Sequence, residues 1–189
     1  MPHKKICNYI FELGVLKKFR HNGTKYAGVI NPDSIAEHIY RATVIGYVLA
    51  ELEEVNPEKV VMICLFHDNA ETRIGDLNKI AQKYLDSSKA EEKAYHDQVK
   101  SLPKKMEDKL NKLFLEYENP TTKEGIIAKD ADILETAFQA KEYFDLGYKT
   151  CESWIDSVEK HLTTDSAKAI LREVRTTEFT DWWQGLKKK

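Results

Sequence analysis

VVMICLFHDNAE, residues 60–71, is the most apolar stretch of the chain and ends on charged side chains. By itself, an apolar run of this length fits either a buried strand or a buried helix. Asn56-Pro57 stands just before it, and this pair supplies a helix N-cap followed by proline at the first helical position. No other segment alternates apolar and polar residues as a partner strand would, so we predict a helix at the centre of the fold.

The remaining segments carry the same helical signal. Apolar residues recur at intervals of three and four positions, and the 189 residues include only five prolines and eight glycines. Sequences of the form Ser/Thr-x-x-Glu, typical of a capping box, begin at Ser34 and Thr121, and Gly147 suits the left-handed end of a helix. We therefore expect an all-α fold in which a single domain spans residues 1–189. The predicted helices cover about residues 3–19, 34–53, 57–68, 89–100, 104–118, 121–146, 151–160 and 165–183, with a loop at 20–33 and a short helix or turn at 80–85.

Charge and cysteine content exclude several classes of protein. Lysine and arginine number 29 against 31 aspartates and glutamates, a formal net charge of −2, which excludes a chain-wide basic field for nucleic acid or an anionic membrane. The longest uncharged apolar run, residues 60–66, is far shorter than the roughly 18 residues of a membrane span. The N-terminal segment lacks a clean apolar stretch with a small-residue cleavage site, so we do not expect export, and Cys7, Cys64 and Cys151 are widely spaced. We therefore expect a cytoplasmic protein with reduced thiols.

His67 and Asp68, at the end of the central apolar stretch, are the first candidates for chemistry. A carboxylate in apolar surroundings is strongly penalised unless it is paired or bound to a cation. The pair alone also fits a helix end with a capping imidazole and an exposed carboxylate. His38 and Asp132, in two further predicted helices, change this interpretation. Two imidazoles and two carboxylates on separate helices can converge on a divalent metal in the core of a bundle.

The order of these four residues carries a family resemblance. His38, His67-Asp68 and Asp132 match the H…HD…D pattern of the HD superfamily of metal-dependent phosphohydrolases. More narrowly, SIAEH, FHDNAE, ETRIGD and AKDAD resemble its 5′-deoxynucleotidase branch. The resemblance covers about residues 6–148, so the predicted helices within 151–183 add little to it. It implies an HD-domain helical bundle.

The resemblance also implies an activity and its machinery. Members of this branch release phosphate from nucleoside 5′-monophosphates, so a (deoxy)ribonucleoside 5′-monophosphate is the implied substrate. Glu71 would position or deprotonate the attacking water, and Asp76 would assist proton transfer. The implied ligands of a divalent cation, for which Mn, Co, Zn, Fe and Mg are all open, are His38, His67, Asp68 and Asp132.

Two substrate contacts follow from the same resemblance. Arg20, just before the SIAEH helix, resembles the phosphate-binding arginine of the family, and Glu118 resembles an acid near the sugar hydroxyls. The family usually has an aromatic residue soon after this arginine. Here His21 follows at once and Tyr26 comes only later, so the sugar contacts depart from the family pattern.

Other polar residues near these motifs have simpler interpretations. We expect Glu37 to cap its helix rather than to act in catalysis. We expect Asp130 to face away from Asp132 and to pair with Lys129. The remaining histidines are predicted to be surface residues: His3, His21, His96 and His161.

Several alternatives remain open. A related HD phosphohydrolase would act on a triphosphate, cyclic or alarmone nucleotide, and a vestigial site would leave a nucleotide-binding or scaffold protein. An HD-type di-iron oxygenase needs further histidines between His67 and Asp132, where only His96 is available. The partners we expect are a small-molecule nucleotide and a second copy in a homodimer, with no nucleic acid and no membrane.

Overall fold

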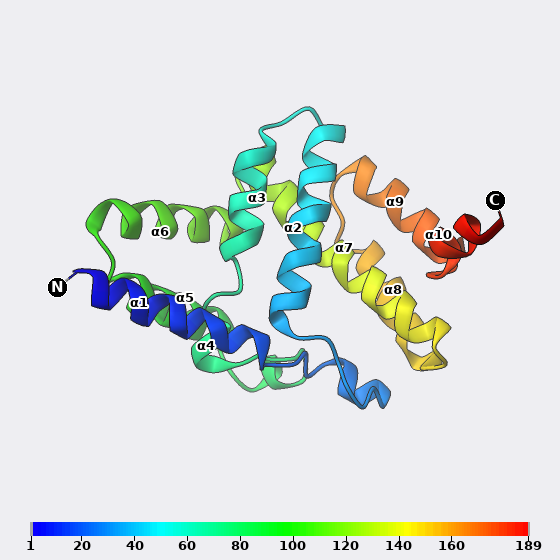
Figure 1. Ribbon diagram of the computed structural model, residues 1–189, viewed down its shortest axis with the longest axis horizontal. Coiled ribbons are helices and arrows are strands. Elements are labelled where there is room, and N and C mark those ends of the chain that lie inside the picture. The colour runs from blue at the N-terminus through cyan, green and yellow to red at the C-terminus, as the bar shows by residue number, and fades with distance from the viewer. Residues whose placement is uncertain (1, 189) are drawn as a thin grey trace.

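The computed structural model describes residues 2–188, and within this range the regular structure is entirely helical (Figure 1). An isolated antiparallel bridge joins Arg20 to Ser34. The all-α prediction is therefore confirmed. None of the helices in this part of the chain is both long enough and apolar enough to cross a bilayer. The α-helices are α1 (Pro2–Leu13), α2 (Ile35–Leu52), α3 (Pro57–Phe66), α4 (Glu71–Ile74), α5 (Ser87–Val99), α6 (Lys104–Glu118), α7 (Lys123–Asp145), α8 (Glu152–Glu159), α9 (Asp165–Thr176) and α10 (Asp181–Gln184).

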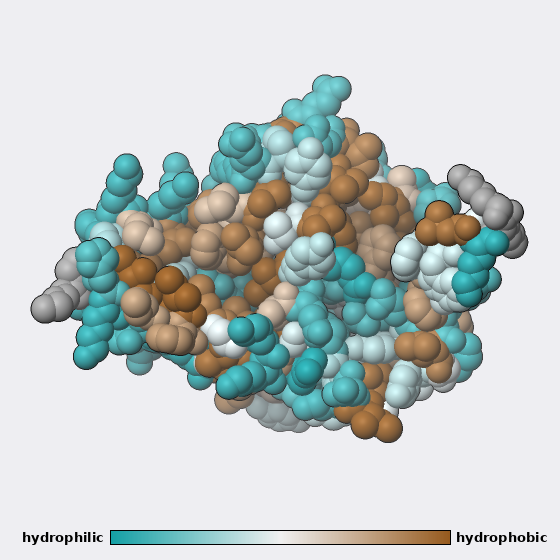
Figure 2. All heavy atoms as spheres, in the orientation of Figure 1, coloured by the Kyte–Doolittle hydropathy of each residue, from teal (hydrophilic) through white to brown (hydrophobic). Residues whose placement is uncertain are grey.

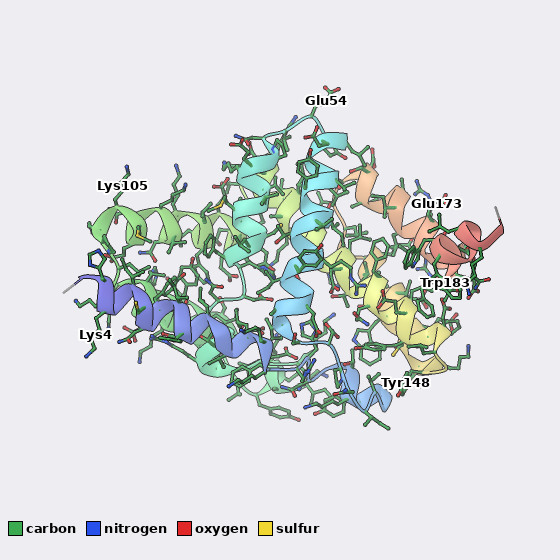
Figure 3. The ribbon with its side chains drawn as sticks, viewed as in Figure 1. Lys4, Glu54, Lys105, Tyr148, Glu173 and Trp183 are labelled. Carbon is green, nitrogen blue, oxygen red and sulfur yellow. The ribbon has the colours of Figure 1, made fainter. Side chains whose placement is uncertain are left out.

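Helices α2, α3 and α7 pack against one another at the centre of the bundle (Figure 1). Their facing side chains, among them Leu49, Val60 and Leu134, are fully buried. Gly46 allows the close approach of α2 to α3, because a Cβ at this position would lie 2.8 Å from Cys64 Sγ. Helices α1, α5 and α6 cover one end of this core and α8–α10 the other. The turn between α2 and α3 is exposed, and the side chain of Glu54 extends from it into solvent (Figure 3).

Capping residues begin the helices, with one difference from the sequence prediction. Ser34 and Glu37 form the predicted capping box. The predicted box at Thr121 is wrong by one residue, because the N-cap of α7 is Thr122, whose hydroxyl accepts from the Gly125 amide. The end of α6 explains the shift. A Cβ on Gly125 would lie 2.6 Å from the Glu116 carbonyl oxygen, so glycine is placed where α7 starts against α6.

The first and last predicted helices are shorter than the apolar pattern indicates. Helix α1 ends at Leu13, and the chain continues as a 3-10 helix from Gly14 to Lys17, where glycine weakens the α-helix. Helix α9 ends at Thr176, because Thr177 is extended, and α10 is a separate turn. β-Branched residues lose side-chain freedom in a helix, which favours an end at this threonine pair.

Asp130 corrects another prediction, because it does not pair with Lys129. Its side chain is buried and accepts hydrogen bonds from the Thr163 amide (2.9 Å), the Thr164 amide (2.7 Å) and the Thr164 hydroxyl (2.6 Å). Thr164 is the N-cap of α9, so the carboxylate joins α7 to the start of α9. The negative charge of Asp130 also interacts favourably with the positive end of the α9 dipole.

We predict that Asp130→Ala lowers the free energy of unfolding by about 2–3 kcal/mol, because three hydrogen bonds to a buried carboxylate are lost. Chemical denaturation in the presence of a chelator measures this loss without a contribution from metal. Asp108→Ala is the matched control, since Asp108 is exposed on α6. Equal stability of the two variants would show that Asp130 does not hold α9.

Candidate metal centre

Three helices bring four ligand-type side chains together. His38 lies in the first turns of α2, His67 and Asp68 directly follow α3, and Asp132 lies near the middle of α7. His38 Nε2 is 3.1 Å from Asp132 Oδ1 and 3.5 Å from Asp68 Oδ2. His67 Nε2 is 3.0 Å from Asp68 Oδ2 and 3.6 Å from Asp132 Oδ1. Two nitrogens and two oxygens therefore alternate around one centre.

This arrangement fits a divalent cation. Ligand atoms about 2.1 Å from an octahedral ion lie about 3 Å apart at adjacent positions, which is close to the spacing here. His38, His67 and Asp132 each offer one ligand atom, and these three atoms lie within 4.8 Å of one another, whereas Asp68 lies outside that group and joins the cluster through its contacts with the two imidazoles. The buried Nε2 of His67 has no well-aligned hydrogen-bond partner. An unpartnered nitrogen facing two carboxylates is what a cation would bind.

The electrostatics of the four residues demand positive charge at the same place. Burial opposes a charge on His38, but Glu135 and Asp132 outweigh it and hold its pKa well above the ordinary value. Burial likewise opposes a charge on His67, whereas Asp68 and Asp132 raise its pKa to about 10. Burial alone would raise the pKa of Asp132, yet the two imidazoles hold it well below its usual range. Protons on the imidazoles and a divalent cation are alternative ways to balance the carboxylates, so metal binding releases protons.

The imidazoles are oriented by hydrogen bonds on their far sides. His38 Nδ1 donates to Glu135 Oε2 at 2.6 Å, and His67 Nδ1 donates to the Cys64 carbonyl at 2.6 Å. Each bond leaves Nε2 directed at the centre. Glu135 is buried in turn and accepts from Arg41 Nε at 2.9 Å.

Sequence reasoning missed Glu135 and Arg41, although a signal was present. Glu135 follows Asp132 by three residues on α7, and Arg41 follows His38 by three residues on α2. On a helix this spacing places both members of a pair on one face. An acid on the α7 face that carries Asp132 is therefore a natural partner for His38.

The four residues lie in a hollow of about 260 Å³ that also contains the two predicted catalytic acids. Burial, together with the carboxylates of Asp68 and Asp76, raises the pKa of Glu71 to about 10, and Glu71 Oε2 has no hydrogen-bond partner. The Glu71 amide donates to the Asp68 carbonyl at 3.0 Å, which ties it to the centre. Asp76 accepts from the Asn22 amide and so joins the hollow to the loop before α2.

The two predicted substrate contacts differ in position. Glu118 lines the hollow with the cluster. Arg20 lines a neighbouring hollow instead, and its guanidinium donates to Glu37 Oε2 and to the Pro32 carbonyl, each at 3.2 Å. The contact of Arg20 with phosphate stays a prediction, and it requires this side chain to leave Glu37.

His21 was predicted to be a surface residue, and this is wrong. Its ring lines the hollow and meets the His38 ring edge-on at 4.9 Å between centroids. His21 Nδ1 donates to Asp33 Oδ2 at 2.8 Å, and Asp33 accepts a second bond from the Tyr143 hydroxyl. The loop before α2 therefore folds over the centre, which no periodic pattern in residues 20–33 indicates.

The other predicted surface histidines mostly agree with the structure. His3 and His161 are exposed. His96 is partly buried against α6, where its ring packs near Phe114 and its Nδ1 lies 2.8 Å from Asn111 Oδ1. It does not line the hollow with the cluster.

Comparisons with known proteins agree with this geometry. A sequence profile described as HD domain matches residues 13–175. The human protein named 5′-deoxynucleotidase HDDC2 is 30% identical over 149 residues, which cover 77% of this chain and 72% of the relative. Its mouse counterpart is 31% identical over 90% of this chain and 87% of its own length. A solved structure described as a conserved hypothetical protein from Pyrococcus furiosus is 34% identical, covers 90% of this chain and 99% of its own, and superposes with a TM-score of 0.78.

We predict that Glu135→Ala weakens Mn²⁺ or Co²⁺ binding by about 10–100-fold, because His38 loses the partner that orients its ring. Isothermal titration calorimetry measures the affinity directly. The matched control is Glu142→Ala, since Glu142 also pairs with Arg41 and has no contact with His38. If both variants bind metal as the unchanged protein does, Glu135 does not support the site.

Proposed function

We propose that this protein is a divalent-metal-dependent phosphohydrolase that releases phosphate from nucleoside 5′-monophosphates. The chain belongs to the HD domain family. The observation that carries this proposal is the ring of two imidazole nitrogens and two carboxylate oxygens inside a hollow of about 260 Å³. The relatives named 5′-deoxynucleotidase support the choice of a monophosphate substrate.

His38, His67, Asp68 and Asp132 would hold the cation. A divalent cation bound there would supply Lewis acidity toward a phosphoryl oxygen and would lower the pKa of bound water from about 16 toward 7. The pair of imidazole ligands favours a first-row transition ion such as Mn²⁺, Fe²⁺, Co²⁺ or Zn²⁺ over Mg²⁺, which prefers oxygen ligands. Hydrolysis of a phosphate monoester is extremely slow without a catalyst, and an enzyme supplies on the order of 20 kcal/mol or more.

Glu71 would take the proton of the attacking water. Its Oε2 has no hydrogen-bond partner among residues 2–188, so it is available to a water in the hollow. Burial and neighbouring carboxylates keep this group protonated when no cation is present. A divalent cation held by the cluster would favour the ionised form of Glu71. Glu71 would then be able to act as the base.

Asp76 would assist proton transfer to the leaving group, and its contact with the Asn22 amide holds it at the edge of the hollow. Glu118 lines the same hollow and is proposed to accept from the sugar hydroxyls, where a carboxylate is a suitable acceptor. The predicted contact of Arg20 with phosphate is kept as part of this proposal.

A homodimer and a cytoplasmic location complete the proposal. Apolar spheres gather over α2 and α3 in Figure 2. A second copy would cover this surface, because contiguous exposed apolar side chains often mark an interface. Large exposed side chains along α2 are Tyr40, Val44, Tyr47, Val48 and Leu52.

We predict that a panel of nucleotides, tested with each added metal, shows preferred phosphate release from deoxy- or ribonucleoside 5′-monophosphates. A triphosphate would bring more negative charge into a hollow lined by several carboxylates, so its turnover should be lower. Preferred turnover of triphosphates would contradict the monophosphatase proposal. If the purified protein contains no metal and shows no activity after addition of Mn²⁺ or Co²⁺, these results would favour a non-catalytic nucleotide-binding role.

We predict that Glu71→Ala binds metal normally but loses turnover by about a hundredfold or more, because the proton acceptor is removed while the ligands remain. Asp68→Ala should lose both metal and turnover. Metal content and the rate of phosphate release are measured on the same samples. Glu58→Ala, at an exposed glutamate on α3, serves as the control. A fully active Glu71→Ala variant would show that the assigned base is wrong.

A further inference from the structure

The hollow that contains the metal cluster is poor in cations for a site that accepts phosphate. A phosphate monoester is a dianion near neutral pH, and carboxylates around it oppose its entry. Among the described residues that line the hollow, Lys129 is the one lysine or arginine. The acidic residues that line it are Asp68, Glu71, Asp76, Glu91, Glu118 and Asp132.

Lys129 is held in an arrangement that no ion pair explains. It lies on α7, three residues before Asp132, and it is partly buried. Its Nζ lies 3.7 Å from the centroid of the Tyr117 ring. Within residues 2–188 no carboxylate oxygen comes within 4.0 Å of this ammonium. The ring therefore supplies a cation–π contact, and the N–H donors remain available to a ligand.

The same tyrosine connects the ammonium to the metal cluster. The Tyr117 hydroxyl donates to Asp132 Oδ2 at 2.5 Å, and the Tyr117 ring packs against His67 at 4.8 Å between centroids. Lys129 thus lies against the face of a ring whose hydroxyl contacts a proposed ligand. The contact holds the ammonium over this ring, in the same hollow as the cluster.

The charge of Lys129 also acts within the hollow. Burial, followed by Glu118 and Asp68, raises the pKa of Glu91 to about 7, and Lys129 opposes this rise. Arg20, the arginine that resembles a phosphate ligand, points away to Glu37 in a separate hollow. Lys129 is therefore the cationic side chain already positioned to meet a dianion.

We propose that Lys129, supported by the ring of Tyr117, binds the phosphate group of the substrate. The inference rests on the proposed function and deepens it, because it assigns the phosphate end of the hollow to Lys129. It leaves Glu118 for the neutral hydroxyl groups of the nucleoside. The phosphate is recognised by charge-assisted hydrogen bonds from the ammonium, which phosphate oxygens accept well.

Calorimetric binding of inorganic phosphate to the metal-loaded protein tests this assignment without turnover. Lys129→Met should weaken phosphate binding about tenfold or more, and phosphate should lose potency as a product inhibitor to the same extent. Lys129→Arg retains the charge and should stay within about threefold of the unchanged protein. Lys123→Met, at an exposed lysine of the same helix, is the matched control. Metal content and thermal unfolding show that each variant is folded and loaded.

Arg20→Met tests the alternative assignment, in which Arg20 rather than Lys129 binds the phosphate. If Arg20→Met abolishes phosphate binding while Lys129→Met leaves it unchanged, the assignment to Lys129 is overturned. If Lys129→Arg weakens phosphate binding as much as Lys129→Met does, the loss does not reflect the charge at position 129, and the assignment is again overturned. Failure of the proposed function has a different signature, because the unchanged protein would then release no phosphate from any nucleoside monophosphate.

Discussion

The structure depends on one electrostatic constraint, the convergence of two imidazoles and two carboxylates on a single centre. His38, His67, Asp68 and Asp132 come from three helices, and their facing atoms lie 3.0–3.6 Å apart. Without positive charge such a cluster is unfavourable in a buried place. The packing of α2, α3 and α7 must therefore serve the cluster as well as the core, and Gly46 is the point where α2 comes close enough to α3.

Hydrogen bonds and packing contacts around the four cluster residues orient them and form the walls of the hollow. Glu135 and the Cys64 carbonyl direct the imidazole nitrogens inward, and Arg41 balances the buried charge of Glu135. The loop before α2 and the end of α6 then close the hollow with His21 and Tyr117. The residues that orient the imidazoles lie on the core helices, whereas His21 and Tyr117 lie on segments packed over them.

Much of this was predictable from the sequence, and the rest has physical reasons. The helical periods, the Ser34 capping box and the four cluster residues are local patterns or a motif order, and the structure places all four side chains together. Apart from the contacts of Glu135 and Arg41, contacts between distant segments left no such signal. Asp130 holds the start of α9, and His21 folds under its loop onto His38, because of packing that only the assembled bundle creates. Thr122 replaces Thr121 as the N-cap for the same reason, since α6 fixes where α7 begins.

The most direct test of the account is anomalous diffraction from crystals grown with Mn²⁺ or Co²⁺. We expect one strong peak about 2.0–2.3 Å from His38 Nε2, His67 Nε2 and one carboxylate oxygen each of Asp68 and Asp132. A peak at another place, or an ion that leaves out either imidazole, would contradict the claim that these four side chains form one metal centre.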